Sequence, residues 1–430
     1  MKTSNRKIRQ TLGALAFAAG AALAWCGAAQ AQDSLLFWSS QATPVTEAQA
    51  MRDIVLPDFG APVDFQPQDP GAFITRIQAE LSAGEGQIAV IGGLHGEFSS
   101  FPDGLVDLSD ILQGAGAEVA YADLGALGTG EQKYIPWMQA TYIMAANKQA
   151  LEYLPDGADL NTLTYDQLIA WATALAEGTG GPKFGLPAGP KGLIHRFVQG
   201  TLYPSFTDSM VTKFRSAEAE AMWNKMKELW AVTIPSSPSY DFMQDPLLTG
   251  EVWLAWDHVA RLSNAFNEKP DDFVAFPSPI GPTGRGFMPV VAGLGVPTSA
   301  PDQEASKRLV TYMMQPETQL KTLRATNFFP VVPVEIPADM PSSVKIAGPV
   351  IAAQTTSAEA NPGLLPVGLG ELGGQFSKVY TDTFQRILLA GQPVREVLDQ
   401  QAQALKAVMD QANAPCWAPD EPSEGACPVE

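Results

Sequence analysis

Hydrophobic and polar positions repeat along the chain with two different periods, and each period predicts a different kind of element. Short apolar runs that end in serine or glycine predict buried strands at "SLLFWSS" (34–40), "IAVIGG" (88–93) and "VVAGLGV" (290–296). Apolar residues three and four positions apart predict helices, beginning with Phe73, Ile77 and Leu81. The same spacing returns in four later segments, at 222–230, 309–314, 376–388 and 394–409.

The first two strand segments and the helix between them predict part of a parallel sheet. Strand, helix and strand with a glycine-rich exit is the alternation of α/β proteins, whose ligand sites lie beyond the carboxyl ends of the strands. This geometry favours ligand contact by residues that follow these strands, namely Ser39, Ser40, Gln41, His95 and Glu97. Further along, Thr164 and Gln167 form a capping box, which predicts that a helix begins there.

The N-terminal segment has the organisation of a secretory signal peptide. Basic residues precede an apolar run from Leu12 to Trp25, and the small-residue stretch 29–31 follows. The run is shorter than the roughly 20 residues that a membrane span needs. We therefore expect cleavage after Ala31 and a periplasmic mature chain. Cys26 loosely resembles the lipidated cysteine of a lipoprotein, but the bulky Trp25 before it argues against a lipid anchor.

Charge and cysteine content narrow the range of partners. The formal net charge is −19, and cleavage after Ala31 removes four basic residues and no acidic one, which gives −23. Such a surface repels nucleic acid, and it disfavours an acidic ligand unless local arginines reverse the field. Cys416 and Cys427 lie in a proline-rich tail and are predicted to form a disulfide, with a structural zinc pair as the alternative.

Signatures of catalysis are scarce. The sequence contains no G-x-S-x-G elbow, no H-E-x-x-H pair and no Walker loop. The stretch "GLGELG" (368–373) matches a dinucleotide-binding pattern, but no strand is predicted before it. We interpret this stretch as a loop that leads into the Phe376 helix.

Metal and carboxylate chemistry receive little support from the residue pattern. The three histidines, His95, His195 and His258, lack the neighbouring ligands of a zinc site, so we expect no metal and no cofactor. A secreted glycoside hydrolase stays open as the enzyme alternative, because two carboxylates need only be about 5 to 9 Å apart in space. The acids expected near one cleft are Glu97, Asp257 and Glu371.

The order of segments resembles the family of bacterial extracellular solute-binding proteins of carbohydrate ABC importers, the group that contains maltose-binding protein. The resemblance spans nearly the whole mature chain and rests on "LLFWSSQ", "IAVIGGLHGEFSSFPDGLVDLSDIL", "YIPWMQATYIMAANKQALEYL", "TYDQLIAWATALAE", "GEVWLAWDHVARL", "FPSPIGPTGR", "EASKRLVTYMMQPETQ" and "NFFPVVP". The family's usual Tyr-Asn-Lys is replaced by Ala146, Asn147 and Lys148. Such departures bear on the substrate more than on the fold.

The resemblance implies an α/β protein with the two-lobed type II fold of periplasmic binding proteins, in which each lobe is a mixed sheet flanked by helices. About 400 mature residues also favour two domains over one. Matching segments assign 32–141 and 287–340 to lobe one, 142–286 and 341–415 to lobe two, and 416–430 to a tail. The ligand cleft would lie between the lobes at a hinge of several chain crossings.

The resemblance also gives the stretch "WLAWDH" (253–258) a role as a strand that lines the cleft from lobe two. Alternation sends Trp253 and Trp256 to opposite faces, so either ring can wall the cleft. An indole suits the C–H face of a pyranose, and carboxylate or amide acceptors suit its rim. The candidates from lobe two are Trp256, Asp257 and His258, with core packing of Trp256 and helix capping by Asp257 as the alternatives.

The candidates from lobe one are Trp38, Ser39, Gln41, His95 and Glu97. Glu371 and Gln375 occupy the family's third binding segment, whereas Arg261 and Arg285 are expected to pair with surface acids. The expected function is capture of a sugar or polyol by a monomer, followed by delivery to a membrane permease. An anionic glycoside or glycerol phosphate is the alternative ligand, and a polyamine is a third.

Overall fold

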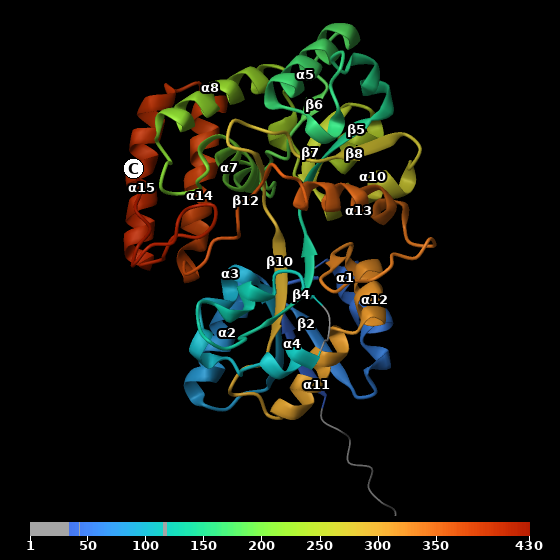
Figure 1. Ribbon diagram of the computed structural model, residues 1–430, viewed down its shortest axis with the longest axis vertical. Coiled ribbons are helices and arrows are strands. Elements are labelled where there is room, and N and C mark those ends of the chain that lie inside the picture. Colours follow the sequence, from blue (N-terminus) through green and yellow to red (C-terminus); the bar gives the residue numbers. More distant parts are fainter. Residues whose placement is uncertain (1–33, 43, 115–117) are drawn as a thin grey trace, which may run out of the picture. The chain divides into compact units, whose positions relative to one another are not determined.

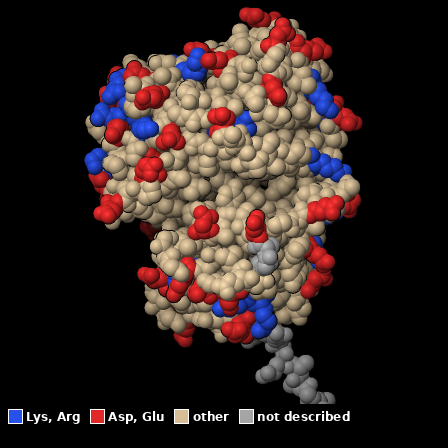
Figure 2. Space-filling view, in the orientation of Figure 1, with Lys and Arg blue, Asp and Glu red and all other residues tan. Residues whose placement is uncertain are grey.

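The protein is described from a computed structural model that covers residues 34–42, 44–114 and 118–430. The predicted signal segment 1–31 and Cys26 lie outside the described residues. From Ser34 to Glu430 the chain forms one compact unit of mixed strands and helices. No helix among the described residues is both long and apolar enough to span a membrane. Acidic side chains are spread over the face shown in Figure 2.

A six-stranded sheet organises one part of this unit, with the order β11-β4-β10-β3-β1-β2. β1 (Leu35–Ser39) pairs in parallel with β2 (Val63–Pro67) and β3 (Ile88–Leu94), and α2 (Pro70–Ala83) connects the latter two. β10 (Val290–Gly295) and β4 (Ile135–Ala140) extend the sheet with antiparallel pairing to β3 and β10, and β11 (Phe329–Pro330) closes the edge. The predicted strands at 34–40, 88–93 and 290–296 are confirmed.

Helices cover this sheet and bury its apolar side chains. They include α1 (Val45–Ala50), η1 (Met51–Val55), α3 (His95–Phe98), α4 (Ser109–Gly114), α11 (Gln303–Met313) and α12 (Pro316–Thr326). Phe37, Val90 and Leu294 belong to one buried cluster, and Phe73 and Ile77 of α2 belong to another. We refer to the residues packed around this sheet as lobe one.

A four-stranded sheet organises the second part, with the order β6-β7-β5-β8. Its strands are β6 (Phe184–Gly185), β7 (Leu254–His258), β5 (Tyr142–Asn147) and β8 (Phe273–Phe276). Its helices are α5 (Tyr165–Thr179), α6 (Ile194–Phe197), the π-helix η7 (Val198–Leu202), α7 (Tyr203–Thr207), α8 (Ala217–Ala231), α9 (Gln244–Thr249), α10 (Val259–Glu268), α13 (Ser342–Thr355), α14 (Gly373–Phe384) and α15 (Val394–Ala412). One large buried cluster joins them, and we refer to this part as lobe two.

Neighbouring crossings connect the lobes (Figure 1). The chain passes from β4 to β5 at Thr141, returns from β9 (Arg285–Phe287) to β10 at Met288, and leaves again after β11. Thr141 Oγ1 donates to the Met288 carbonyl at 3.0 Å. Gln354 Nε2 of α13 donates to Thr141 Oγ1 at 3.2 Å and to the Tyr142 carbonyl at 3.1 Å. Hydrogen-bonded crossings of this kind are the arrangement expected of a hinge, and the fold is the predicted two-lobed one. The residues at which each lobe begins and ends stay a prediction.

The helices predicted to begin at Thr164 and to cover 376–388 are confirmed. Thr164 Oγ1 accepts from Gln167 N, and Gln167 Oε1 accepts from Thr164 N, so the capping box begins α5 as expected. The apolar stripe at 376–388 forms α14 and continues as a π-helix, η10 (Gln385–Leu389). "GLGELG" leads into α14 through a short 3₁₀ turn, η9 (Gly370–Leu372), as the loop interpretation requires.

The C-terminal tail is tied to lobe two at several points. Cys416 and Cys427 form the predicted disulfide. Between them, the buried Asp420 carboxylate accepts five hydrogen bonds from the segment 209–212, from three backbone N–H groups and two hydroxyls. Trp417 packs edge-on against Phe376 of α14, with ring centroids 5.5 Å apart. The tail therefore supports the segment that precedes and begins α14.

Candidate functional site

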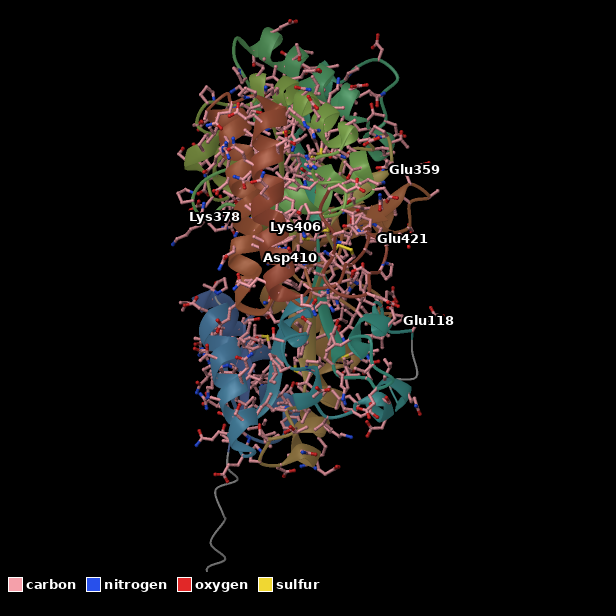
Figure 3. The ribbon with its side chains drawn as sticks, turned by 90° about the vertical axis from the view of Figure 1, so that its left-hand side faces the viewer. Glu118, Glu359, Lys378, Lys406, Asp410 and Glu421 are labelled. Atoms are coloured by element: carbon pink, nitrogen blue, oxygen red, sulfur yellow. A yellow bond between two sulfur atoms is a disulfide. The ribbon has the colours of Figure 1, made fainter. Side chains whose placement is uncertain are left out.

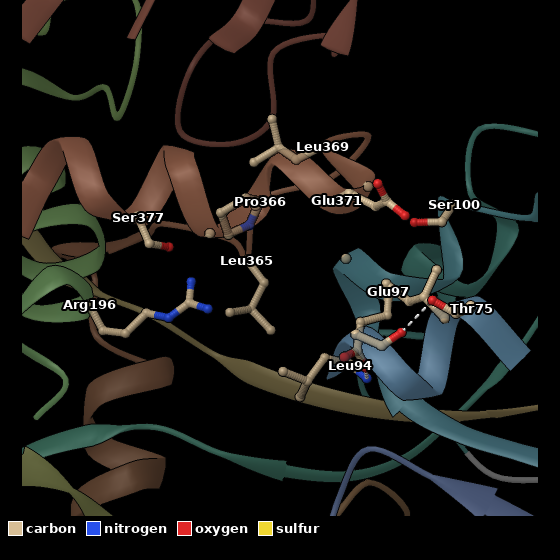
Figure 4. A pocket seen from close by; sticks show the side chains of 16 residues that line it. Thr75, Leu94, Glu97, Ser100, Arg196, Leu365, Pro366, Leu369, Glu371 and Ser377 are labelled. Atoms are coloured by element: carbon tan, nitrogen blue, oxygen red, sulfur yellow. Dashed lines mark hydrogen bonds between the residues drawn. The ribbon is translucent and has the colours of Figure 1, made fainter. Parts of the chain in front are cut away.

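A pocket of about 430 Å³ lies between the lobes and takes its lining from both of them (Figure 4). Lobe one contributes the start of α2 and the segment from the end of β3 through α3. Lobe two contributes Arg196 of α6 and the segment that enters α14. The lining residues include Ile74, Thr75, Leu94, Glu97, Ser100, Arg196, Leu365, Leu369, Glu371 and Ser377. We refer to the two sets as the lobe-one wall (71–75 and 94–100) and the lobe-two wall (196 and 365–377).

The lobe-one wall is built at the carboxyl ends of two neighbouring parallel strands. Because Ser39 pairs with Gly92, the residues after β1 and β3 emerge side by side. Ser40 Oγ donates to Glu97 Oε2 at 2.5 Å, and Leu94 N donates to the same oxygen at 2.7 Å. Gln41 Nε2 donates to Ser40 Oγ at 3.0 Å. Burial raises the pKa of Glu97, although both hydrogen bonds act in the opposite direction.

The two walls touch at one edge of the pocket. Ser99 Oγ accepts a hydrogen bond from Gly368 N at 2.8 Å and donates to the Gly96 carbonyl at 2.7 Å. A Cβ atom on Gly96 would collide with the carbonyl oxygen of Pro366. Glycine is therefore required at position 96 for this approach of the two walls.

Arg196 is the cation of the pocket, and its guanidinium points into the open space (Figure 4). Its Nη1 atom contacts Gln199 Oε1 at 3.4 Å and Met288 Sδ at 3.9 Å, both weak interactions. No carboxylate of the described residues lies within ion-pairing distance of it. Burial lowers the pKa of Arg196, while Tyr142 and Glu97 raise it.

The rest of the lobe-two wall is held from behind by the tail. Leu364 N donates to the Ala418 carbonyl at 2.9 Å, and Gly368 lies against Ala414 and Pro415. In front, the segment presents Leu365 and Leu369 together with the carboxylate of Glu371. A solute in the pocket would thus meet apolar side chains, hydroxyls, two carboxylates and one guanidinium.

Of the ten predicted contact residues, Glu97 and Glu371 line this pocket. Gln375 lies exposed in the first turn of α14, outside the lining. Trp38 is buried, donates from Nε1 to the Phe73 carbonyl at 3.3 Å and lies under Arg76. Ser39 is buried as well, and its hydroxyl accepts from Gln41 N at 2.9 Å.

His95 points inward rather than toward the pocket. Its Nδ1 atom lies 2.7 Å from Tyr134 Oη, and its ring is buried. Burial lowers the pKa of His95 to about 4, despite the opposing charge of Asp123. The residues after β1 and β3 are thus brought together as predicted, but only Glu97 among those named presents its side chain to the pocket.

Trp256 lies in the core of lobe two. Its indole stacks on Tyr142 at 4.7 Å between ring centroids, meets Phe197 edge-on at 4.8 Å, and is fully buried. Trp253, directly before β7, is half-buried and donates from Nε1 to the Gly250 carbonyl at 3.1 Å. Neither ring lines the pocket. Trp256 packs in the core, which is the alternative given for it above, and the residues that line the pocket include no aromatic side chain.

Asp257 and His258 are also buried in lobe two. Asp257 accepts from Met243 N at 2.9 Å and from its neighbour's N–H at 2.7 Å, and burial raises its pKa to about 7. His258 Nδ1 accepts from Ala260 N at 3.3 Å. The cap of α10 is therefore His258 and not Asp257, because the aspartate accepts from N–H groups outside the helix.

The expectation that Arg261 and Arg285 pair with surface acids is wrong for the described residues. Arg285 is buried and donates to the Asn161 carbonyl. Arg261 donates to the Asp241 carbonyl at 3.0 Å and lies over the ring of Phe242. Both use carbonyl oxygens in place of carboxylates. Within the described ranges, no three metal-binding side chains gather around one point.

Arg196 is the charged residue of the pocket that the sequence analysis missed. It sits in a four-residue helix that runs directly into a π-helix, so no periodic stripe marks it. π-helical turns are frequent at functional sites. The only signal in the sequence is "IHRF" itself, a His-Arg pair between apolar residues.

Two lobes around a hinge, with a pocket lined from both, define the class of two-lobed binding proteins. The profile of the bacterial extracellular solute-binding proteins matches residues 42–320. The chain belongs to this family, and the resemblance inferred from the sequence is confirmed. Membership gives the chain a role in binding a solute, and it leaves the solute open. No curated protein sequence gives a significant match.

Solved structures with similar folds cover most of the chain. Maltose-bound MalE3 of T. maritima aligns over 87% of this chain and 99% of its own, with 18% identity and a TM-score of 0.67. The sugar-binding protein MalE of Xanthomonas citri aligns over 87% and 97%, with 14% identity and a TM-score of 0.69. UgpB of Mycobacterium tuberculosis, in complex with glycerophosphocholine, aligns over 88% and 98%, with 17% identity and a TM-score of 0.66. At these identities the likeness is one of fold.

Proposed function

We propose that this chain is the periplasmic solute-binding component of an ABC importer. It captures a hydroxyl-rich solute such as a sugar, glycoside or polyol between its lobes, and it hands the solute unchanged to a membrane permease. The observation that carries this proposal is the pocket lined by both lobes, with Glu97 on one wall and Glu371 on the other. The sugar ligands named for two of the similar structures support the same class of solute.

Closure of the cleft is the physical basis of capture. A solute that touches both walls makes more contacts in the closed form, so it shifts the balance of conformations toward closure. Moving that balance from mostly open to mostly closed takes about 5 kcal/mol of differential binding. A micromolar binder has about 8 kcal/mol of binding free energy, which is sufficient. The pocket volume of about 430 Å³ favours a compact solute over a long oligosaccharide.

Small-angle scattering tests this function. We expect at least one member of a panel of mono- and disaccharides, polyols and their anionic derivatives to shrink the particle and to raise its melting temperature. Thr75→Trp places an indole in the pocket from an exposed position of α2 and should abolish both effects. Gln78→Trp, on the same helix but outside the lining, is the matched control. Compaction that survives Thr75→Trp would place binding elsewhere, and no compaction with any member would refute the proposal.

The hydrolase alternative has its own test. Incubation with chromogenic glycosides should give saturable thermal stabilisation without release of the chromophore, because binding to the native state stabilises it whether or not turnover occurs. Release that disappears in Glu97→Gln or Glu371→Gln would make the protein an enzyme.

A further inference from the structure

The charged groups of the pocket differ in how well the protein satisfies them. Glu97 accepts two hydrogen bonds from its own lobe. Arg196 carries five N–H donors, yet its contacts within the described residues are the two weak ones of Nη1. Its Nε and Nη2 atoms have no acceptor there and face the pocket (Figure 4).

Other arginines of the chain show what a satisfied guanidinium looks like. Arg215 donates to the Asp399 carboxylate at 3.0 Å, and Arg324 donates to that of Asp339 at 2.7 Å, both on the surface. Arg52 donates two hydrogen bonds, from Nε and Nη2, to the Phe65 carbonyl. Arg196 differs from these three because it lines a pocket while its Nε and Nη2 atoms have no acceptor among the described residues. A cation removed from water and left without a partner is unfavourable, and an anion in that space would offset the cost.

The N-terminal end of α14 borders the same space. Gly373 and Gly374, in the first turn of this twelve-residue helix, line the pocket, and no side chain caps that end. A Cβ atom at either position would meet nothing within 4 Å, so this turn leaves open space on its pocket side, although the Gly373 N–H itself donates to the Gly370 carbonyl. The N-terminal end of a helix favours negative charge, and α14 packs against the α6 helix that carries Arg196.

We infer that the solute carries an anionic group, a phosphoryl, sulfonyl or carboxyl group, which pairs with Arg196, and a hydroxyl-rich body that extends toward Glu97 and Glu371. This inference rests on the proposed function and narrows its solute class. It also gives a protein with a strongly negative net charge a local partner for an acidic ligand, since Arg196 supplies positive charge at one point of the pocket.

Matched pairs of probes test the inference by titration calorimetry and thermal shift. The pairs are glycerol 3-phosphate with glycerol, glucose 6-phosphate with glucose, and glucuronate with glucose. We expect one or more anionic probes to bind saturably and to exceed the neutral partner in affinity by about 10- to 150-fold, the range for hydrogen bonds to charged groups. Which anionic probe binds distinguishes a phosphoryl from a carboxyl group.

Variants assign the effect to Arg196. Arg196→Gln should remove the preference for the anionic probe, and Arg196→Lys should keep part of it because the charge stays. Arg215→Gln is the matched control on the surface. Without solute, Arg196→Gln should leave the melting temperature unchanged or raise it, which a structural arginine would not do.

The outcomes separate this inference from the function. If neutral sugars bind as well as the anionic probes, or if Arg196→Gln keeps the anionic preference, the inference is wrong while capture of a polyhydroxylated solute stands. If no probe of either kind binds, both are wrong.

Discussion

The two walls of the pocket are built in opposite ways. The lobe-one wall is held within its own lobe, since Glu97 accepts hydrogen bonds from Leu94 N, three residues away, and from Ser40 at the end of the adjacent strand. The lobe-two wall combines Arg196 with a segment almost 170 residues later, and it is held by the C-terminal tail. One wall is therefore self-supporting, and the other depends on remote parts of the chain.

Damage to the tail should disturb the lobe-two wall and leave the lobe-one wall intact, because the tail packs in the core of lobe two.

The largest effect is expected for Asp420→Ala. Five donors of the segment 209–212 lose their acceptor at a buried position. Each unsatisfied buried donor costs about 1–3 kcal/mol, and partial access of water reduces the sum, so we expect a loss of roughly 4 kcal/mol in the free energy of unfolding. Urea titration measures it. Glu421→Ala, at the exposed neighbour labelled in Figure 3, is the control and should change little. Equal stability of both variants would mean that the tail does not brace lobe two.

Opening the disulfide should have the next largest effect. Cys416 and Cys427 close a short loop that holds Asp420 in place. A disulfide of this kind contributes about 2–4 kcal/mol. The double variant Cys416→Ser/Cys427→Ser, or the wild type in reductant, should lose that amount and bind its solute more weakly. Reductant should have no effect on the double variant, and an effect there would exclude the disulfide as the cause.

The buried titratable groups beneath the walls predict pH responses of opposite sign. Burial lowers the pKa of His95 to about 4, so the unfolded chain takes up a proton first and stability is lost as pH falls from about 6.5 to 4. Burial raises the pKa of Asp257 to about 7, so the folded chain holds the proton longer and stability is lost as pH rises from about 4 to 7.

Chemical unfolding across pH 4 to 7 checks both signs. Relative to the wild type, His95→Gln and Asp257→Asn should change the slope of unfolding free energy against pH by about 1.4 kcal/mol per pH unit in opposite directions. Slopes that change in the same direction would contradict the burial assigned to one of the two groups.

The smallest effect on stability is expected for Gly96→Ala, although its effect on closure should be large. The added methyl group collides with the Pro366 carbonyl of the other wall, while the backbone at Gly96 itself accepts alanine. The melting temperature should therefore stay within a degree or two of the wild type, as for changes of about 0.5 kcal/mol or less. Binding should weaken by about tenfold or more. Gly181→Ala, which has free space around it, is the control, and normal binding by Gly96→Ala would show that the walls do not meet in the bound state.

The lobe-one wall and the capped helices could be predicted from local sequence patterns. The neighbouring positions of Ser40, Gln41 and Glu97 follow from two parallel strands that share an edge, a local rule that needs only the pattern of apolar runs. The helices with caps and long stripes, such as α5 and α14, follow from equally local signals.

The lobe-two wall follows from no local rule. Arg196 meets the segment 365–377 only because the helices around the four-stranded sheet pack as they do. Trp256 illustrates the same limit, since β7 is buried on both faces and alternation along a strand cannot then distinguish a cleft wall from the core. Prediction of this wall requires tertiary contacts that no short window of sequence contains.

The central claim is that a solute bound between the walls draws them together. Pulsed electron paramagnetic resonance on nitroxide labels at Gln78→Cys of α2 and Lys378→Cys of α14 measures the distance across the pocket directly, because both positions are exposed on the helices that flank it (Figure 3 labels Lys378). The account predicts that a saturating solute from the panel shortens and narrows the distance distribution, and that Gly96→Ala reduces this change. An identical distribution with and without a solute that is shown to bind would contradict it.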